Sequence, residues 1–161
     1  WLRARAGVLP SAVMDDATFW DLISSIDTVA LTRGDEETAL ELLRARVADL
    51  GPAAIDGFHD RLSQALYDLD GRDHFNAAGD NADGDDAFLY ARCYVVALGR
   101  AHHTAVLANP SQMPQTHEEW CEVLLYVAPE AWAERADQDP ADYDHLSPVS
   151  YDRGANQARW R

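Results

Sequence analysis

Apolar residues recur every three or four positions along most of this chain, and this spacing most constrains its fold. Because such spacing gathers apolar side chains on one face of an α-helix, it predicts amphipathic helices. No segment alternates polar and apolar residues convincingly, as a strand would. The chain is therefore expected to be an all-α, single-domain bundle of about five main helices. These are predicted at about 16–31, 35–50, 52–69, 85–108 and 116–128, followed by a short helix over 130–137.

Residues with known preferences for helix ends set these boundaries. Gly51-Pro52 ends one helix and begins the next. Thr116-x-x-Glu119 has the spacing of a capping box and predicts the start of the fifth helix. Pro129 is expected to kink or restart that helix, because its ring clashes with the preceding turn. Gly99 lies inside the predicted fourth helix, where it would allow another backbone or a ligand to approach closely.

The length of 161 residues fits one domain, which we place at 14–138. Residues 1–13 are interpreted as an N-terminal extension or a cloning remnant. Residues 139–161 show no helical period and are predicted to be an irregular C-terminal tail. Aromatic residues in this tail are expected to pack it on the bundle as an extended strap.

The charge is strongly negative, with 28 acidic residues against 13 basic ones and a net charge of −15. Such a chain lacks the basic face that duplex nucleic acid or an anionic membrane requires. Residues 68–86 hold seven Asp and one Arg, and they are interpreted as a solvated acidic loop. No apolar run approaches the length of a membrane span. Two widely spaced cysteines do not indicate a disulfide framework, so we expect a cytoplasmic protein.

Four short motifs occur in a familiar order. They are Phe19-Trp20-x-Leu22-Ile23, Ala65-Leu66-Tyr67-Asp68-Leu69, Asp85-Asp86-x-Phe88-x-Tyr90-x-Arg92 and Leu125-Tyr126-Val127-Ala128-x-Glu130-Ala131. In this order the chain resembles a bacterial family of small helical proteins, the domain-of-unknown-function 4240 family, over roughly residues 14–138. The resemblance implies an all-α, soluble bacterial protein and no assigned activity. The chain departs from the family pattern at 70–75 and 79–84, where polar residues replace an apolar run and a Gly-Gly-Cys-Ser segment.

Spacings typical of metal sites and of covalent catalysis do not occur. The Asp-rich segment cannot be aligned with an EF-hand loop, since neither glycine register places ligands at the first and last positions. Asp56-x-x-His59 and Asp142-x-x-His145 lack the glutamates of a di-iron bundle. There is no Gly-x-Ser-x-Gly elbow and no phosphate-binding glycine loop. We therefore predict neither a metal nor a cofactor.

Polar residues on faces expected to be buried supply the candidate site. One interpretation places them around one interhelical pocket, where histidine exchanges protons, tyrosine donates to an oxyanion and arginine holds an enolate or carboxylate. The alternative is structural, with Arg92 paired to Asp68, Asp85 or Asp86 and the histidines satisfied in the core. The candidate residues are His59, Tyr67, Tyr90, Arg92, Tyr94 and His102.

Two functions remain open at this point. The first is a small, cofactor-independent acid–base enzyme that tailors a carbonyl-containing metabolite in bacterial secondary metabolism by dehydration, conjugate addition, isomerisation or cyclisation. Its partner would be a small-molecule substrate, and the absence of lysine excludes Schiff-base chemistry. The second is a non-catalytic acidic protein of the immunity, regulatory or nucleic-acid-mimic type, which binds a basic partner. The sequence does not indicate an oligomeric state.

Overall fold

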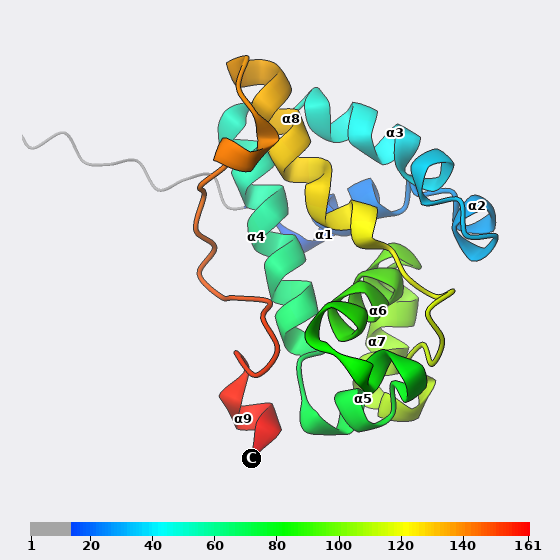
Figure 1. Ribbon diagram of the computed structural model, residues 1–161. Helices are drawn as coiled ribbons and strands as arrows, with labels where there is room; N and C mark the ends of the chain where they lie inside the picture. The colour runs from blue at the N-terminus through cyan, green and yellow to red at the C-terminus, as the bar shows by residue number, and fades with distance from the viewer. Residues whose placement is uncertain (1–13) are drawn as a thin grey trace, which may run out of the picture.

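The computed structural model describes residues 14–161, so the predicted N-terminal extension lies outside the described residues. The described part is helical and contains no strand, which confirms the all-α prediction. It has nine α-helices instead of about five, because two predicted helices are interrupted and short helices form in the Asp-rich segment and in the tail (Figure 1). The α-helices are α1 (Asp16–Ile23), α2 (Thr28–Thr32), α3 (Glu36–Ala48), α4 (Pro52–Asp68), α5 (Arg72–Asn76), α6 (Asp85–Ala97), α7 (Arg100–Ala108), α8 (Val127–Ala136) and α9 (Gln157–Trp160). Short 3-10 helices are η1 (Gly79–Asp83), η2 (Pro110–Gln112), η3 (Glu122–Tyr126) and η4 (Pro140–Asp142).

The longest helix, α4, is the centre of the molecule. It begins as predicted after Gly51, with Pro52 in its first turn. Its apolar stripe of Ile55, Phe58 and Leu62 is completely or almost completely buried. Each such side chain contributes about 1.5–3 kcal/mol by leaving water. Four helices pack against α4, which therefore lies at the centre of the bundle: α1, α3, α6 and α8.

Two predicted helices are broken where a new cap or a glycine intervenes. The expected helix over 16–31 is α1 and α2, because the Asp27 side chain accepts hydrogen bonds from the Val29 and Ala30 amides and starts a second helix. The expected helix over 85–108 ends at Ala97 and restarts at Arg100. Gly99 has a φ of +104°, which favours glycine, so it breaks the helix instead of lying inside it.

The predicted start of the fifth helix is wrong. Residues 116–121 form turns, and the Thr116 hydroxyl lies 3.4 Å from the Glu119 carboxylate without opening a helix. The chain then forms η3, and α8 begins only at Val127. Pro129 lies in the first turn of α8, where its missing N–H has no helical partner to lose. Pro129 therefore neither kinks nor restarts a preceding α-helix, because α8 follows a 3-10 helix and begins two residues before the proline.

The Asp-rich segment is more ordered than its interpretation as a solvated loop suggests. It contains α5 and η1, which pack against each other. Asp70 is completely buried and accepts hydrogen bonds from the Gly154 amide, the Asn156 amide and the Trp160 indole at 2.8–3.1 Å. An aspartate in this segment thus fastens the C-terminal end of the chain.

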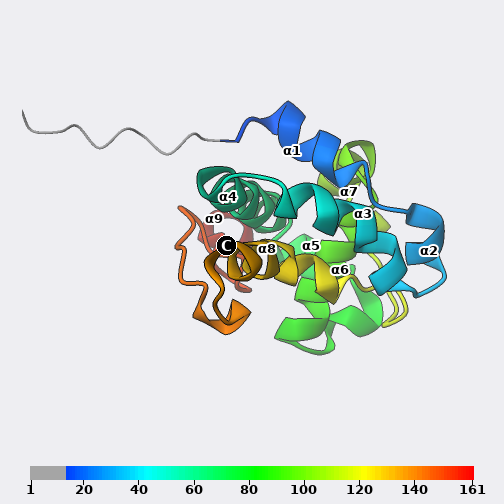
Figure 2. The same ribbon diagram turned by 90° about the horizontal axis from the view of Figure 1, so that it is seen from above.

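The C-terminal tail runs alongside α4 and ends in α9 (Figure 1), and the view from above keeps it beside the same helix (Figure 2). Three tail side chains bond to carboxylates of α4: the Tyr143 hydroxyl to Asp56, and both His145 and Ser147 to Asp60. None of the described helices is long and apolar enough to cross a membrane.

Candidate functional site

His59 and Ser63 lie one turn apart on the face of α4 that the tail covers. The spacing of four residues places their side chains next to each other along the helix. His59 is half-buried, and Ser63 is only 1% exposed. Within residues 14–161, His59 Nδ1 and Ser63 Oγ are buried and have no hydrogen-bond partner. Because a buried polar atom without a partner costs about 1–3 kcal/mol, this pair requires an explanation.

The tail forms the opposite wall and is held there by two carboxylates of α4. His145 Nε2 lies 2.8 Å from Asp60 Oδ1, and His145 Nδ1 lies 3.7 Å from Asp56 Oδ2. The Ser147 hydroxyl donates to the same Asp60 oxygen at 2.7 Å. The Tyr143 hydroxyl donates to Asp56 at 2.9 Å. These bonds orient the His145 ring, whose centroid lies 6.1 Å from that of His59.

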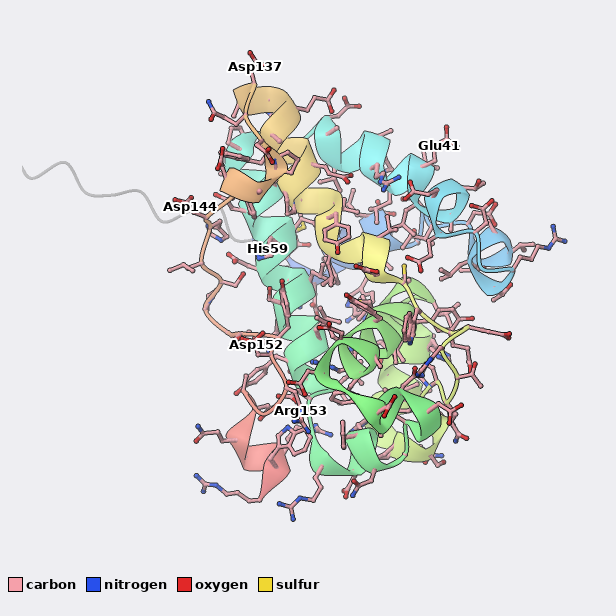
Figure 3. All side chains as sticks on the ribbon, viewed as in Figure 1. Glu41, His59, Asp137, Asp144, Asp152 and Arg153 are labelled. Carbon is pink, nitrogen blue, oxygen red and sulfur yellow. The ribbon has the colours of Figure 1, made fainter. Side chains whose placement is uncertain are left out.

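A pocket of about 250 Å³ lies between these two walls. His59 and Ser63 come from α4, whereas the other lining residues come from the tail. In Figure 3 the labelled His59 lies on α4, and Asp152 lies on the tail that runs beside it. This volume lies below the range of about 300–1,000 Å³ that holds drug-sized ligands, so only a smaller molecule fits. The tail residues that line the pocket are His145, Leu146, Ser147, Val149, Ser150, Tyr151 and Asp152.

The surroundings keep His59 neutral near pH 7. Burial lowers the pKa of His59, and the nearby His145 lowers it further, against the opposing effect of Asp60 and Asp56. A neutral imidazole can accept a proton, and a hydroxyl such as that of Ser63 can donate a hydrogen bond to a substrate oxygen. Burial and the bond to Asp56 raise the pKa of Tyr143, so this phenol stays protonated. The site thus pairs one free base with one free donor.

Arg92 is completely buried, but it holds the fold together instead of facing this pocket. Its guanidinium donates to the Leu66 carbonyl at 3.0 Å and to the Tyr151 carbonyl at 2.9 Å, and it lies 4.5 Å from the Phe88 ring centroid. Nε has no partner among the described residues. No ion pair with the predicted Asp68, Asp85 or Asp86 is formed there, because backbone carbonyls take their place.

The structure brings some of the predicted site residues together and separates others. His59 and Arg92 meet at Tyr151: His59 packs on its ring at 6.4 Å between centroids, and Arg92 binds its carbonyl. Tyr67 lies close by, and its carbonyl accepts a hydrogen bond from the Asn156 side chain. Three of the six predicted residues, His59, Tyr67 and Arg92, therefore lie near segments of the tail.

The other three predicted residues lie near the segment 119–122 instead: Tyr90, Tyr94 and His102. The Tyr90 ring packs against Trp120 at 5.3 Å, and burial together with Glu122 raises the pKa of Tyr90 to about 12. Tyr94 is buried, and its pKa is raised by burial and by Glu119. His102 is half-buried, and burial lowers its pKa, partly opposed by Glu119. The six residues do not surround one common pocket.

The break at Gly99 explains why His102 is not the inward-facing histidine. An unbroken helix would continue the stripe of Phe88 to residue 102, but the new helix α7 presents His103 instead. His103 is buried, and its Nε2 lies 2.9 Å from the Ala65 carbonyl. His74 is also completely buried and lies 3.0 Å from the Val106 carbonyl. Both rings have partners and are structural.

Sequence reasoning missed Ser63, His145 and Asp152 as pocket residues. Ser63 had a local signal, since it follows His59 by four residues on a helix whose neighbouring positions are apolar. The two tail residues had none, because they reach α4 only through contacts more than 80 positions away in the sequence. In the part of the chain that the structure describes, no three His, Cys, Asp or Glu side chains are arranged to hold a metal ion.

Comparison with known proteins adds a family but no activity. Neither the curated proteins nor the solved structures include a match to this chain. Residues 14–134 match the family described as "Protein of unknown function (DUF4240)". The matched region covers α1 to most of α8 and ends before the tail that forms one wall of the pocket. The chain belongs to the DUF4240 family.

Proposed function

We propose that this protein is a cofactor-independent acid–base enzyme whose substrate occupies the pocket between α4 and the tail. The observation that carries the proposal is the pair of buried, unpartnered groups, His59 Nδ1 and Ser63 Oγ, at the wall of that pocket. A fold retains such groups at a cost, and a ligand that satisfies them when it binds offsets this cost.

The roles follow from the chemistry of the two groups. His59, neutral because of its lowered pKa, removes a proton from the carbon next to a substrate carbonyl. Ser63 donates a hydrogen bond to the carbonyl oxygen, which becomes negative as the proton leaves. Arg92 has no part in this step, because its terminal nitrogens are bound to two carbonyls. The same proton transfer serves dehydration, conjugate addition, isomerisation or cyclisation.

The setting that we propose is secondary metabolism in the cytoplasm of a bacterium. The pocket favours an enzyme over an acidic interaction protein, since a charged surface alone would not need two unpartnered polar groups beneath the tail. It also explains why the tail residues His145 and Ser147 are fixed by hydrogen bonds to α4 instead of lying free.

Hydrogen–deuterium exchange tests the proposal without knowledge of the natural product. The protein is incubated in D₂O with a panel of small ketones and hydroxyketones, and deuterium next to the carbonyl is followed by ¹H NMR. We expect the wild-type protein to accelerate exchange for at least one compound and His59→Gln to slow it about 100-fold or more. His117→Gln is the matched control, because His117 is exposed and lies outside this pocket.

Two results would contradict the proposal. One is a wild-type protein that accelerates exchange in no compound of the panel. The other is a folded His59→Gln variant, verified by circular dichroism, that exchanges as fast as the wild type.

A further inference from the structure

One carboxylate lines the pocket between α4 and the tail, and two more contact His145, which is also a lining residue. Asp152 forms part of its wall, and Asp56 and Asp60 hold His145 against it from behind. Even when His145 carries a proton, these three carboxylates outnumber it. Asp152 is exposed, Asp56 and Asp60 are partly exposed, and no arginine lines the pocket.

Two arginines lie near this pocket, and the charge of buried Arg92 interacts with that of Asp152. Arg92 points its terminal nitrogens at the Leu66 and Tyr151 carbonyls. The Arg153 guanidinium forms an ion pair with Asp85 at 2.5 Å and lies over the Phe75 ring. Neither arginine lines the pocket. A negatively charged ligand would therefore meet the carboxylate of Asp152 at the wall, with no arginine side chain lining the pocket to bind it.

A second observation at the same pocket points to a ligand. Ser63 lines the same pocket, is 99% buried and leaves its hydroxyl without a partner among residues 14–161. This hydroxyl supplies a buried hydrogen-bonding position on α4, in a pocket that Asp152 of the tail also lines. Leu146 and Val149 add apolar surface between the polar groups.

We infer that the pocket takes a small ligand that carries an ammonium group together with a hydroxyl or carbonyl oxygen. The ammonium group would face Asp152, and the oxygen would bind at Ser63. The inference rests on the proposed function in that it names the substrate class of the same site. It excludes small carboxylates and phosphates as preferred substrates, because the wall that would hold them is acidic.

Binding of three probes of matched shape tests this inference. They are tyramine, 2-(4-hydroxyphenyl)ethanol and 4-hydroxyphenylacetate, which differ mainly in being a cation, a neutral alcohol and an anion. Each is titrated into the full chain, and the ring protons of His59 are followed by NMR. We expect tyramine to bind most tightly, the alcohol more weakly, and the carboxylate about tenfold more weakly than tyramine.

Two variants locate the origin of the preference. Asp152→Asn should reduce the ratio between tyramine and 4-hydroxyphenylacetate several-fold, whereas Ser63→Ala should weaken all probes by a similar factor. Asp144→Asn is the matched control, because Asp144 is an exposed aspartate of the same tail that does not line the pocket. It should change the ratio less than Asp152→Asn does.

The inference is overturned if the carboxylate binds as tightly as tyramine, if Asp152→Asn leaves the ratio unchanged, or if no probe perturbs His59. Its failure differs from failure of the proposed function. A preference for tyramine without any deuterium exchange would support the binding site and contradict the enzyme. Exchange combined with a preference for the anion would support the enzyme and contradict the ligand class.

Discussion

The tail contacts α4 and its surroundings in two places, and they differ in how their buried polar groups are satisfied. At the C-terminal end of α4, Asp70 accepts three hydrogen bonds and Arg92 donates two, so only Arg92 Nε lacks a partner in this part of the described structure. One or two turns earlier on α4, His59 Nδ1 and Ser63 Oγ have none. The first place fastens the tail. The second leaves hydrogen-bonding capacity for a ligand.

The fastened region should show the largest effect of mutation. Asp70→Ala leaves three N–H donors without an acceptor. It also removes the carboxylate whose charge most stabilises the buried Arg92 cation. We expect a loss of about 3–5 kcal/mol in the free energy of unfolding, measured by urea denaturation. Asp83→Ala is the control, because Asp83 is exposed, and it should change stability by less than about 0.5 kcal/mol.

A loss below about 1 kcal/mol for Asp70→Ala would mean that the hydrogen bonds of Asp70 do not hold the tail more firmly than the contacts beside the pocket do. It would mean that the tail is held mainly by its contacts with Asp56 and Asp60, next to the pocket itself.

The pocket region should show a small effect of the opposite sign. Ser63→Ala removes a buried hydroxyl that has no partner, so we expect stability to stay the same or rise by up to about 1 kcal/mol. Ser147→Ala is the matched comparison, because its hydroxyl is bonded to Asp60, and it should lose about 1 kcal/mol. Thermal unfolding of both variants beside the wild type measures the contrast. A clear loss of stability in Ser63→Ala would identify its hydroxyl as structural.

Local patterns in the sequence predicted the helical class and the core, but not the arrangement at helix ends. The stripe of Ile55, Phe58 and Leu62 is buried as expected, because periodicity reports directly which face of a helix is covered. The apolar period predicts a helix that runs through Gly99, but the positive φ of this residue breaks the helix and turns His103 inward instead of His102. Propensity alone does not distinguish a tolerated glycine from a helix break.

The candidate site was predictable only in part. His59 was identified from its place beside the apolar stripe, and Ser63 could have been found from the same helical spacing. The wall formed by His145 and Asp152 depends on long-range contacts of the tail, which leave no local pattern in the sequence. The tail also lies outside the region that matches the family.

An NMR pH titration of the His59 ring tests most directly whether this pocket holds a neutral base. Since burial lowers its pKa, we predict a midpoint below the ordinary histidine value of about 6.5. Between the lowered pKa of the folded state and about pH 6.5, the unfolded chain then binds more protons than the folded one, so His59 should lower stability as the pH falls through this range. A midpoint at or above about 6.5 would contradict the claim that this site holds a neutral, unpartnered base.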